Sequence, residues 1–365
     1  MDVLVMGYYG WNNTGDDAML YSLLDGLKET LSDVRFNITA ASEPFLPGDL
    51  DVRIVPPGIS PALLMAFLRS SMVILGGGTH FFDYGKTSSR IMRLAQILIM
   101  TLTARLTRKR VYFMGVGIER PVHRWSKFLI KNTCRLASKI VVRDSNSMRV
   151  LSEMGVNERA ELSHDLSFFL KYEKRRRKRG LLGVSAMPYF RIYGGDGKKD
   201  ELLVRAFADA IRSWLALDDE NTARLFIFNG REPNDDRRIS MRIAREVNDD
   251  RVRVEDYRPD PRETIAAVAS CDAFVAMKFH AALFAYLNDV PEIIVEYAAK
   301  NRALVEDAGF GRNAIIDLDD VCNGELSGRV EDLYRNPEDY MAARRASEIR
   351  GEFPSLSDDL PLEGR

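Results

Sequence analysis

Short apolar runs alternate with longer amphipathic stretches along most of the chain. The runs are rich in Val, Ile and Leu, which is typical of strands buried on both faces of a parallel sheet. The stretches between them resemble crossover helices, so the pattern predicts an α/β fold with doubly wound parallel sheets. The expected strands cover residues 2–6, 36–41, 52–55, 72–75, 111–114, 139–142, 181–185, 225–228, 252–255, 272–277 and 291–297, and the clearest helices cover 18–31, 61–69, 88–106, 200–217, 262–270 and 281–287.

The helix expected over residues 88–106 is unusually apolar. Its longest apolar stretch, 97–104, is far too short to span a membrane, and arginines flank it. We therefore expect a helix buried in a protein core. The first residues lack the basic and long apolar regions of a signal peptide, and three cysteines without metal-ligand spacing indicate a reducing compartment. These features predict a cytoplasmic protein, and peripheral association with the inner face of a membrane stays open.

A basic run, KYEKRRRKRG at residues 171–180, interrupts the α/β pattern near the middle of the chain. Such a run could contact nucleic acid or anionic lipid, but the net charge of −1 provides no general attraction to either, and a solvated linker is the better interpretation. A chain of 365 residues with 46% hydrophobic residues can bury two cores. We therefore expect an N-terminal domain over 1–172, a linker over 173–180, a C-terminal domain over 181–345 and a polar tail over 346–365.

Two glycine-rich polar loops follow strands of the first half. One reads GYYGWNNTGDD after strand 2–6, and the other reads GGGTHFFD after strand 72–75. The first loop is neither a dinucleotide fingerprint nor a P-loop. Because the carboxyl ends of parallel strands meet at one sheet edge, we expect a ligand-binding wall there, although glycine-eased turns would give a similar pattern. A third strand tip, Arg143-Asp144, fits a local ion pair and helix cap equally well.

The most informative segment is CDAFVAMKFHAALFAYLNDVPEIIVEYAAK, residues 271–300. Lys278 and His280 lie where strand 272–277 ends and a helix begins, which is a favourable place for an anion. A packed structural histidine is the alternative for His280. Arg191, in the loop after strand 181–185, and Lys300, after strand 291–297, add two further cations.

In order and rough spacing, these blocks resemble the polysaccharide pyruvyl transferase family over about residues 1–300. The matching pieces are GYYGWNNTGDDAML, GGGTHFFD, GVGI, KIVVRDSNSMRVLSEMG, HDLSF and AMKFHAALFAYLNDVPEIIVEYAAK. The resemblance implies two Rossmann-like domains facing a cleft, similar to the B-type glycosyltransferases. It also implies transfer of a pyruvyl group from phosphoenolpyruvate to two hydroxyls of a sugar, which forms a cyclic ketal and releases phosphate.

The resemblance implies a donor, an acceptor and roles for individual residues. The acceptor would be a sugar or a lipid-linked or nucleotide-linked glycan precursor of the cell envelope, with no nucleic acid partner, no cofactor and no metal. Phosphoenolpyruvate is anionic, so Lys278, His280, Arg191 and Lys300 are the candidate donor-binding residues. His280 is the candidate acid, and Asp16 or Asp83 the candidate base. The candidate acceptor-binding residues are Tyr8, Asn13, Asp16, Asp17, Gly77, Gly78, His80 and Asp83.

The chain departs from the family pattern at two cation positions. Lys278 stands where the family usually has arginine, and Met187 stands near a second arginine position that Arg191 would have to serve. An arginine can form two parallel hydrogen bonds to one anionic group, whereas a lysine offers a single compact charge. Two alternatives follow: a glycosyltransferase that uses a nucleotide sugar, or a non-catalytic glycan-binding member of the family. The acceptor sugar, the ketal stereochemistry and the oligomeric state are not fixed by the sequence.

Overall fold

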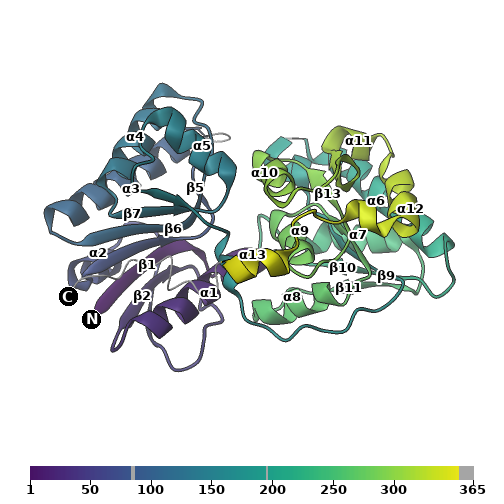
Figure 1. The fold of residues 1–365 in the computed structure, drawn as a ribbon, viewed down its shortest axis with the longest axis horizontal. Helices are drawn as coiled ribbons and strands as arrows, with labels where there is room; N and C mark the ends of the chain where they lie inside the picture. The colour runs from purple at the N-terminus through teal and green to yellow at the C-terminus, as the bar shows by residue number, and fades with distance from the viewer. Residues whose placement is uncertain (84–86, 195, 353–365) are drawn as a thin grey trace. The chain divides into compact units, whose positions relative to one another are not determined.

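The computed structural model describes residues 1–83, 87–194 and 196–352. This part of the chain forms two compact units (Figure 1). Unit 1 comprises Met1–Trp11 and Asp16–Leu170, and unit 2 comprises Asn12–Gly15 and Lys171–Glu352. A short piece of the first loop therefore packs with the second half of the chain. Within the described ranges, no helix is long and apolar enough to cross a membrane.

Unit 1 is built on a parallel sheet with the strand order β3-β2-β1-β4-β6-β7-β8, and β5 pairs with β6. The order reverses at β1, so the sheet is doubly wound as the sequence predicts. The strands are β1 (Asp2–Tyr9), β2 (Arg35–Ala40), β3 (Asp51–Val55), β4 (Met72–Gly76), β5 (Thr79–Phe81), β6 (Arg110–Ile118), β7 (Lys139–Val142) and β8 (Ala160–Leu162).

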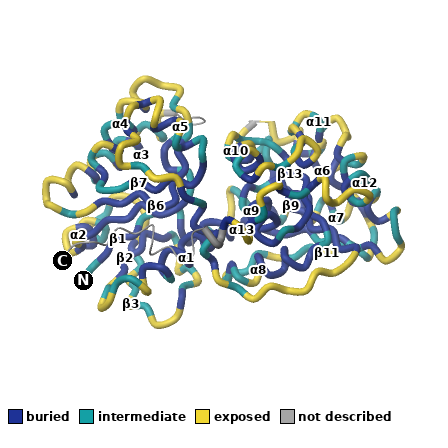
Figure 2. Tube along the Cα trace, viewed as in Figure 1, coloured by how far each residue is buried: buried dark blue, intermediate teal, exposed yellow. Residues whose placement is uncertain are grey.

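Apolar cores cover both faces of this sheet, whose strands are largely buried (Figure 2). Helix α1 (Thr14–Thr30) joins one core with Val3, Val5 and Ile74. On the other core lie α2 (Pro61–Arg69), α3 (Thr87–Leu106), α4 (Arg124–Leu136) and α5 (Ser145–Met154).

The expectation of a buried helix over residues 88–106 is wrong for one face of α3. Leu94, Ile97 and Ala104 are buried in the core, but Met92 and Ile99 are more than 60% exposed. A helix that is apolar all round usually has neighbours on every side, which is why the sequence suggested burial. Here one apolar stripe faces the sheet and another faces solvent.

Unit 2 repeats the design with the strand order β11-β10-β9-β12-β13-β14, again all parallel. Its strands are β9 (Leu181–Ser185), β10 (Thr222–Phe226), β11 (Val252–Glu255), β12 (Ala273–Ala276), β13 (Glu292–Glu296) and β14 (Ile315–Asp317). Its helices are α6 (Asp200–Ala216), α7 (Arg237–Val247), α8 (Pro261–Ala269), α9 (Phe279–Tyr286), α10 (Ala299–Ala308), α11 (Leu318–Cys322), α12 (Leu326–Arg335) and α13 (Ala346–Glu352), with the short turns η2 (Phe190–Gly194) and η3 (Gly197–Lys199) before α6.

The basic run at residues 171–180 has mostly exposed side chains, but it is tied to unit 2. The Lys178 amide donates to the Ser270 carbonyl at 2.9 Å, and the Tyr172 hydroxyl donates to the Asn288 side chain at 2.8 Å. The run thus lies along unit 2, and the main segment of that unit starts at Lys171. Of the expected polar tail, 346–352 form α13, and 353–365 lie outside the described residues.

Candidate functional site

Each sheet has one point where the strand order reverses, and loops diverge there from the carboxyl ends of two neighbouring strands. In unit 1 this point lies between β1 and β4, and in unit 2 between β9 and β12. The loops after β1, β4 and β12 are the ones that carry most of the candidate residues. Topology therefore explains why residues far apart in sequence gather at two places.

In unit 1, Asp16 and His80 converge beside Gly78. A Cβ atom built at Gly78 would lie 3.7 Å from Asp16 Oδ1 and 3.8 Å from His80 Nε2, so both polar atoms face the same point. Gly78 has φ +76°, a backbone conformation that glycine adopts without strain. Asp16 and His80 are both buried, which gives their polar atoms a dry setting.

The protonation state of His80 follows from its neighbour Arg93. An Arg93 N–H lies 3.2 Å from His80 Nδ1, and a guanidinium can only donate, so Nδ1 accepts and the ring proton sits on Nε2. Burial, with the Arg93 charge, lowers the pKa of His80 to about 3, while the nearby Gly76 and Gly77 carbonyls act in the opposite direction. His80 is therefore a neutral Nε2–H donor placed beside the carboxylate of Asp16.

The other candidate acceptor residues of unit 1 have contacts of different kinds. The rings of Tyr8 and Trp11 stack at 5.2 Å between centroids, at the end of β1. Gly77 packs on Met19, where a Cβ would come within 2.6 Å of the sulfur. Asp17 is buried in the first turn of α1.

Asp83 acts as a cap in the structure. Its carboxylate accepts hydrogen bonds from the amides of Val122 and His123, at 2.8 to 3.1 Å, just before α4 begins. Burial would raise its pKa, but these hydrogen bonds outweigh burial and lower the pKa. A carboxylate held in this way is a weak base, so the geometry favours Asp16 over Asp83 for proton transfer.

Arg143 and Asp144 form the local ion pair and helix cap that the sequence allowed. Asp144 accepts from the Ser147 amide at 2.7 Å and caps α5. The buried Arg143 guanidinium contacts Asp144, Asp165 and the Thr79 hydroxyl. This network joins the end of β7 to β5 and stabilises the strand tips of unit 1.

In unit 2, His280 lies in the first turn of α9 and packs directly on the short piece of the first loop. A Cβ at Gly15 would lie only 1.9 Å from His280 Nδ1, so no other residue fits at position 15 without displacing the ring. Backbone hydrogen bonds fix this loop: the Thr14 amide donates to the Phe228 carbonyl and the Gly230 amide to the Asn12 carbonyl, each at 2.9 Å.

Asn13, expected to contact the acceptor, has a structural contact in this arrangement. It pairs with Asn229 in an antiparallel bridge, and its side-chain oxygen accepts from the Gly15 amide at 3.2 Å. The bond closes the turn that presents Gly15 to His280. Asn13 therefore helps to position the imidazole.

Lys278 forms an ion pair with Asp236, a residue that the sequence analysis did not single out. Lys278 Nζ lies 2.8 Å from Asp236 Oδ2, and the Asn229 amide donates to the same carboxylate oxygen at 2.8 Å. Burial raises the pKa of Asp236 to about 6, and Lys278 acts in the opposite direction. The local sequence around Asp236 shows only two aspartates ahead of an amphipathic helix, and that pattern is typical of an ordinary helix cap.

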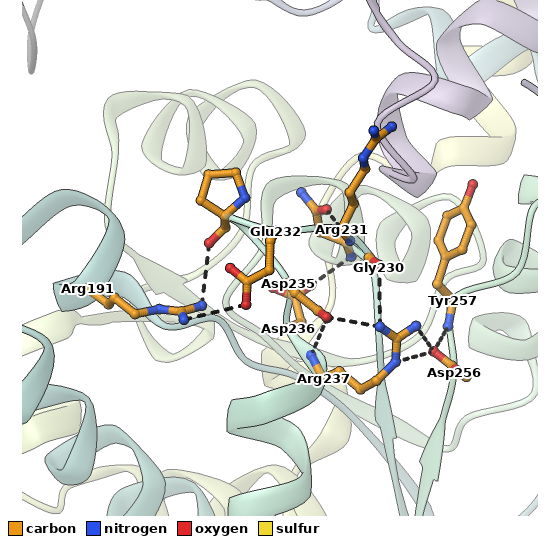
Figure 3. A network of polar contacts seen from close by, with 11 residues as sticks. Arg191, Gly230, Arg231, Glu232, Asp235, Asp236, Arg237, Asp256 and Tyr257 are labelled. Carbon is orange, nitrogen blue, oxygen red and sulfur yellow. Dashed lines mark hydrogen bonds and ion pairs between the residues drawn. The ribbon is translucent and has the colours of Figure 1, made fainter. Parts of the chain in front are cut away.

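Arg191 and Lys300 occupy different surroundings near the ends of β9 and β13. Arg191 contacts Glu232 at 3.7 Å and the Pro233 carbonyl at 3.4 Å, within the polar network around the loop after β10 (Figure 3). Lys300 lies over the rings of Phe279 and Tyr297, at 5.7 and 5.2 Å from their centroids. Phe279 precedes His280, so Lys300 accompanies the imidazole, whereas Arg191 is held by another loop.

Two kinds of chemistry are thus assembled at the strand ends. Unit 1 offers a donor and a carboxylate at one point, which suits a hydroxyl group. Unit 2 offers an imidazole at a helix N-terminus with nearby cations, which suits an anion. Among the described residues, no group of three or more His, Cys, Asp or Glu side chains could hold a metal ion.

Comparison with protein families matches residues 13–298 of this chain to the polysaccharide pyruvyl transferase model. That range contains the β1 loop from Asn13 onward, the glycine-rich loop after β4 and the β12–α9 elbow. A comparison with curated protein sequences finds no match.

Solved structures share the fold at low sequence identity. The UDP-GlcNAc 2-epimerase of Neisseria meningitidis, solved with UDP-GlcNAc, matches with a TM-score of 0.58 and 8% identity, over 98% of this chain and 100% of that one. The corresponding enzyme of Methanocaldococcus jannaschii gives 0.56 and 11%, over 97% and 99%. The glycosyltransferase VinC, solved with dTDP, gives 0.51 and 13%, over 98% and 97%. The expected likeness to B-type glycosyltransferases is confirmed.

Proposed function

Because the chain belongs to the polysaccharide pyruvyl transferase family, we propose that it transfers a pyruvyl group from phosphoenolpyruvate to two hydroxyls of a glycan or glycan-precursor sugar. The observation that carries this proposal is the arrangement at the start of α9. There His280 packs on Gly15, Lys278 lies two residues before it and is paired with Asp236, and the Lys300 ammonium lies over the ring of Phe279. Phosphoenolpyruvate carries a carboxylate and a phosphate, and such a pair of anions needs several cations and a proton donor.

The reaction needs one proton delivered to carbon and two removed from oxygen. Protonation of the methylene carbon of phosphoenolpyruvate makes C2 electrophilic, and the first sugar hydroxyl adds there and loses its proton. The C2–O bond to phosphate then breaks, and the second hydroxyl adds to C2 and closes the ketal. One hydroxyl proton balances the new methyl group and the other leaves with phosphate. We assign His280 as the acid that serves the donor.

For the acceptor, we assign the pair beside Gly78. The Nε2–H of His80 donates to a hydroxyl oxygen, and Asp16 accepts the hydroxyl proton as hydrogen-bond partner and then as base. A neutral histidine suits this task because an imidazolium would compete with the sugar for the carboxylate of Asp16. The stacked rings of Tyr8 and Trp11 offer an apolar face of the kind that packs on a sugar ring.

The cation positions explain how Lys278 can serve in place of an arginine. An ammonium group has three N–H donors, and the ion pair with Asp236 needs one of them. The buried carboxylate thus fixes the direction of a flexible side chain, which compensates in part for the rigid fork that an arginine would supply. Lys278→Arg should bind phosphoenolpyruvate at least as tightly as wild type.

Calorimetric titration of phosphoenolpyruvate tests the proposal. We expect saturable binding that weakens roughly tenfold or more in His280→Ala, because a charge-assisted contact is lost. His123→Ala is the matched control, since its imidazole is exposed before α4 and should leave binding unchanged. Titration of UDP-glucose serves as the second arm, because the structural relatives include enzymes solved with UDP-GlcNAc. Tight UDP-glucose binding with no phosphoenolpyruvate binding would overturn the proposal in favour of a glycosyltransferase.

A further inference from the structure

The outer faces of α2, α3 and α4 carry many large apolar side chains that the catalytic proposal does not use. On α3, Met92, Ile99 and Leu106 are each more than 60% exposed and recur at helical spacing on one stripe. On α4, Trp125 and Phe128 are each more than half exposed. Figure 2 shows exposed positions along both helices. Scattered apolar residues on a surface are ordinary, but a contiguous set usually marks a contact site.

The three helices pack on the same core of unit 1, so their outer sides belong to one region of its surface. Helix α2 adds Leu64 and Leu68, each more than half exposed. Lys109, just beyond the end of α3, donates to the Leu68 carbonyl at 3.1 Å and so joins that end of α3 to α2. Helices α3 and α4 are in direct contact. We call the exposed sides of these three helices the outer helical surface.

The charges on these helices are all of one sign. The three helical segments contain no Asp or Glu, although the whole chain has 53 such residues among 365. Helix α2 has one Arg or Lys and α4 has four. Helix α3 has three, but Arg93 contacts the buried His80 and Arg90 lies over the Phe82 ring, so the positive charge of the surface comes mainly from α4. On α4, Arg124, Lys127 and Lys131 lie near the two aromatic residues, and the Arg124 guanidinium is 5.4 Å from the Trp125 ring centroid. A basic, apolar surface on a chain with net charge −1 is a local feature.

We propose that the outer helical surface binds the surface of an anionic lipid bilayer. Trp, Phe and Leu on one helix face with Lys and Arg beside them are the composition of helices that lie in the membrane interface. The apolar side chains would enter the acyl boundary, and the cations would contact lipid phosphates. This proposal does not depend on the identity of the donor or the reaction.

Charge decides between a bilayer and the other partners that an apolar surface could take. A second copy of this chain, docked through the same surface, would place cations against cations with no carboxylate on the three helices to compensate. A nucleic acid would match the charge, but its interfaces are polar and would bury Trp125, Phe128 and Ile99 without benefit. An anionic bilayer satisfies both the apolar and the basic character.

Vesicle flotation with the full chain tests this proposal. We expect binding to vesicles of phosphatidylcholine with one quarter phosphatidylglycerol, and much weaker binding to phosphatidylcholine alone. Lys127→Glu with Lys131→Glu should weaken binding at least about twentyfold, since each cation near an anionic surface contributes about fivefold. Trp125→Ser with Phe128→Ser should weaken it about tenfold or more.

A matched pair of substitutions in unit 2 controls for loss of apolar surface. Leu202 and Met241 are also exposed, at 42% and 46%, and Leu202→Ser with Met241→Ser should leave vesicle binding unchanged. Trp125→Phe should keep binding but lose the blue shift of tryptophan emission that insertion of Trp125 causes. Because these side chains are exposed, the circular dichroism melting curves of all variants should overlay that of wild type.

Three results would overturn the proposal. One is absence of flotation with the phosphatidylglycerol vesicles at millimolar lipid. Another is flotation that the α4 variants do not weaken. The third is a wild-type dimer in analytical ultracentrifugation that becomes a monomer in the Trp125→Ser, Phe128→Ser variant, because that would assign the outer helical surface to a second copy of the chain.

Discussion

Replacement of Asp236 by asparagine should change how stability depends on pH. The Asp236 carboxyl is fully buried beside Lys278, and burial raises its pKa to about 6 from an ordinary 3.8. Between these two values the folded protein keeps a proton that the unfolded chain releases. Stability therefore falls as pH rises through this window, since the folded state binds more protons than the unfolded state. An asparagine side chain does not titrate, so the variant lacks this fall.

The magnitude follows from the pKa difference. One pKa unit corresponds to about 1.4 kcal/mol, so the wild type should lose roughly 3 kcal/mol relative to Asp236→Asn between pH 4 and pH 7. The reference is the exposed Asp250, because Asp250→Asn removes one carboxylate from unit 2 without a buried partner.

Urea unfolding at pH 4.5, 5.5 and 7.5 measures this difference. The buried Trp214 of α6 reports on unit 2 when Trp11 and Trp125 are replaced by Phe in all variants. The free energy of unfolding of Asp236→Asn minus that of wild type should increase at each step to higher pH. The same difference for Asp250→Asn should stay constant. A constant difference across the three pH values would refute the reasoning, because it would mean that Lys278 fully offsets the burial of the carboxylate.

Three further predictions follow from contacts of single residues. Gly15→Ala should abolish phosphoenolpyruvate binding in calorimetry while the fold persists, because the new methyl group would meet the His280 ring; retention of wild-type affinity would contradict this packing. Asp83→Ala should lower the free energy of unfolding by about 2 kcal/mol in urea through loss of the cap before α4, and Asp83→Asn should retain most turnover, whereas a catalytic base would lose it. Glu292→Met should raise the free energy of unfolding by about 1 to 3 kcal/mol at pH 8. Both carboxylate oxygens of Glu292 are buried without a hydrogen-bond partner among the described residues, and burial raises the pKa of this carboxyl well above its ordinary value. An unchanged urea midpoint would contradict this reasoning, because it would mean that the carboxyl group has a partner that stabilises it.

The strands and the fold class were predictable because buried parallel strands have a simple pattern. Mostly apolar runs gave β7 and β9 with their observed limits, since few other elements are so short and so apolar, and the alternating Val-Arg-Val-Glu gave β11. Helix α7 is absent from the sequence prediction although its buried positions recur at helical spacing, because charged residues separate them. The exposed stripe of α3 could not be inferred, because an apolar helix face carries no mark of what covers it.

The candidate residues were predictable as types but not as pairs. The strand ends indicated His80 and Asp16, but their approach beside Gly78 depends on β1 and β4 being neighbours in the sheet. The same is true of Lys278, whose partner Asp236 precedes a helix far away in sequence. Long-range contacts of this kind depend on chain topology, and a single sequence contains no direct record of them.

Because part of the first loop belongs to unit 2, a cut in the middle of the chain does not separate the two units cleanly. Residues Asn12–Gly15 complete unit 2 through bonds to the Phe228 carbonyl and the Gly230 amide, yet they are encoded ahead of nearly all of unit 1. A fragment that begins at Lys171 would lack them, and the His280 ring would lose the surface on which it rests. Exchange of halves between family members at the middle of the chain would likewise pair the loop of one parent with the imidazole of the other. We therefore expect hybrids to work best when residues 12–15 come from the same parent as the second half and residues 1–11 stay with unit 1.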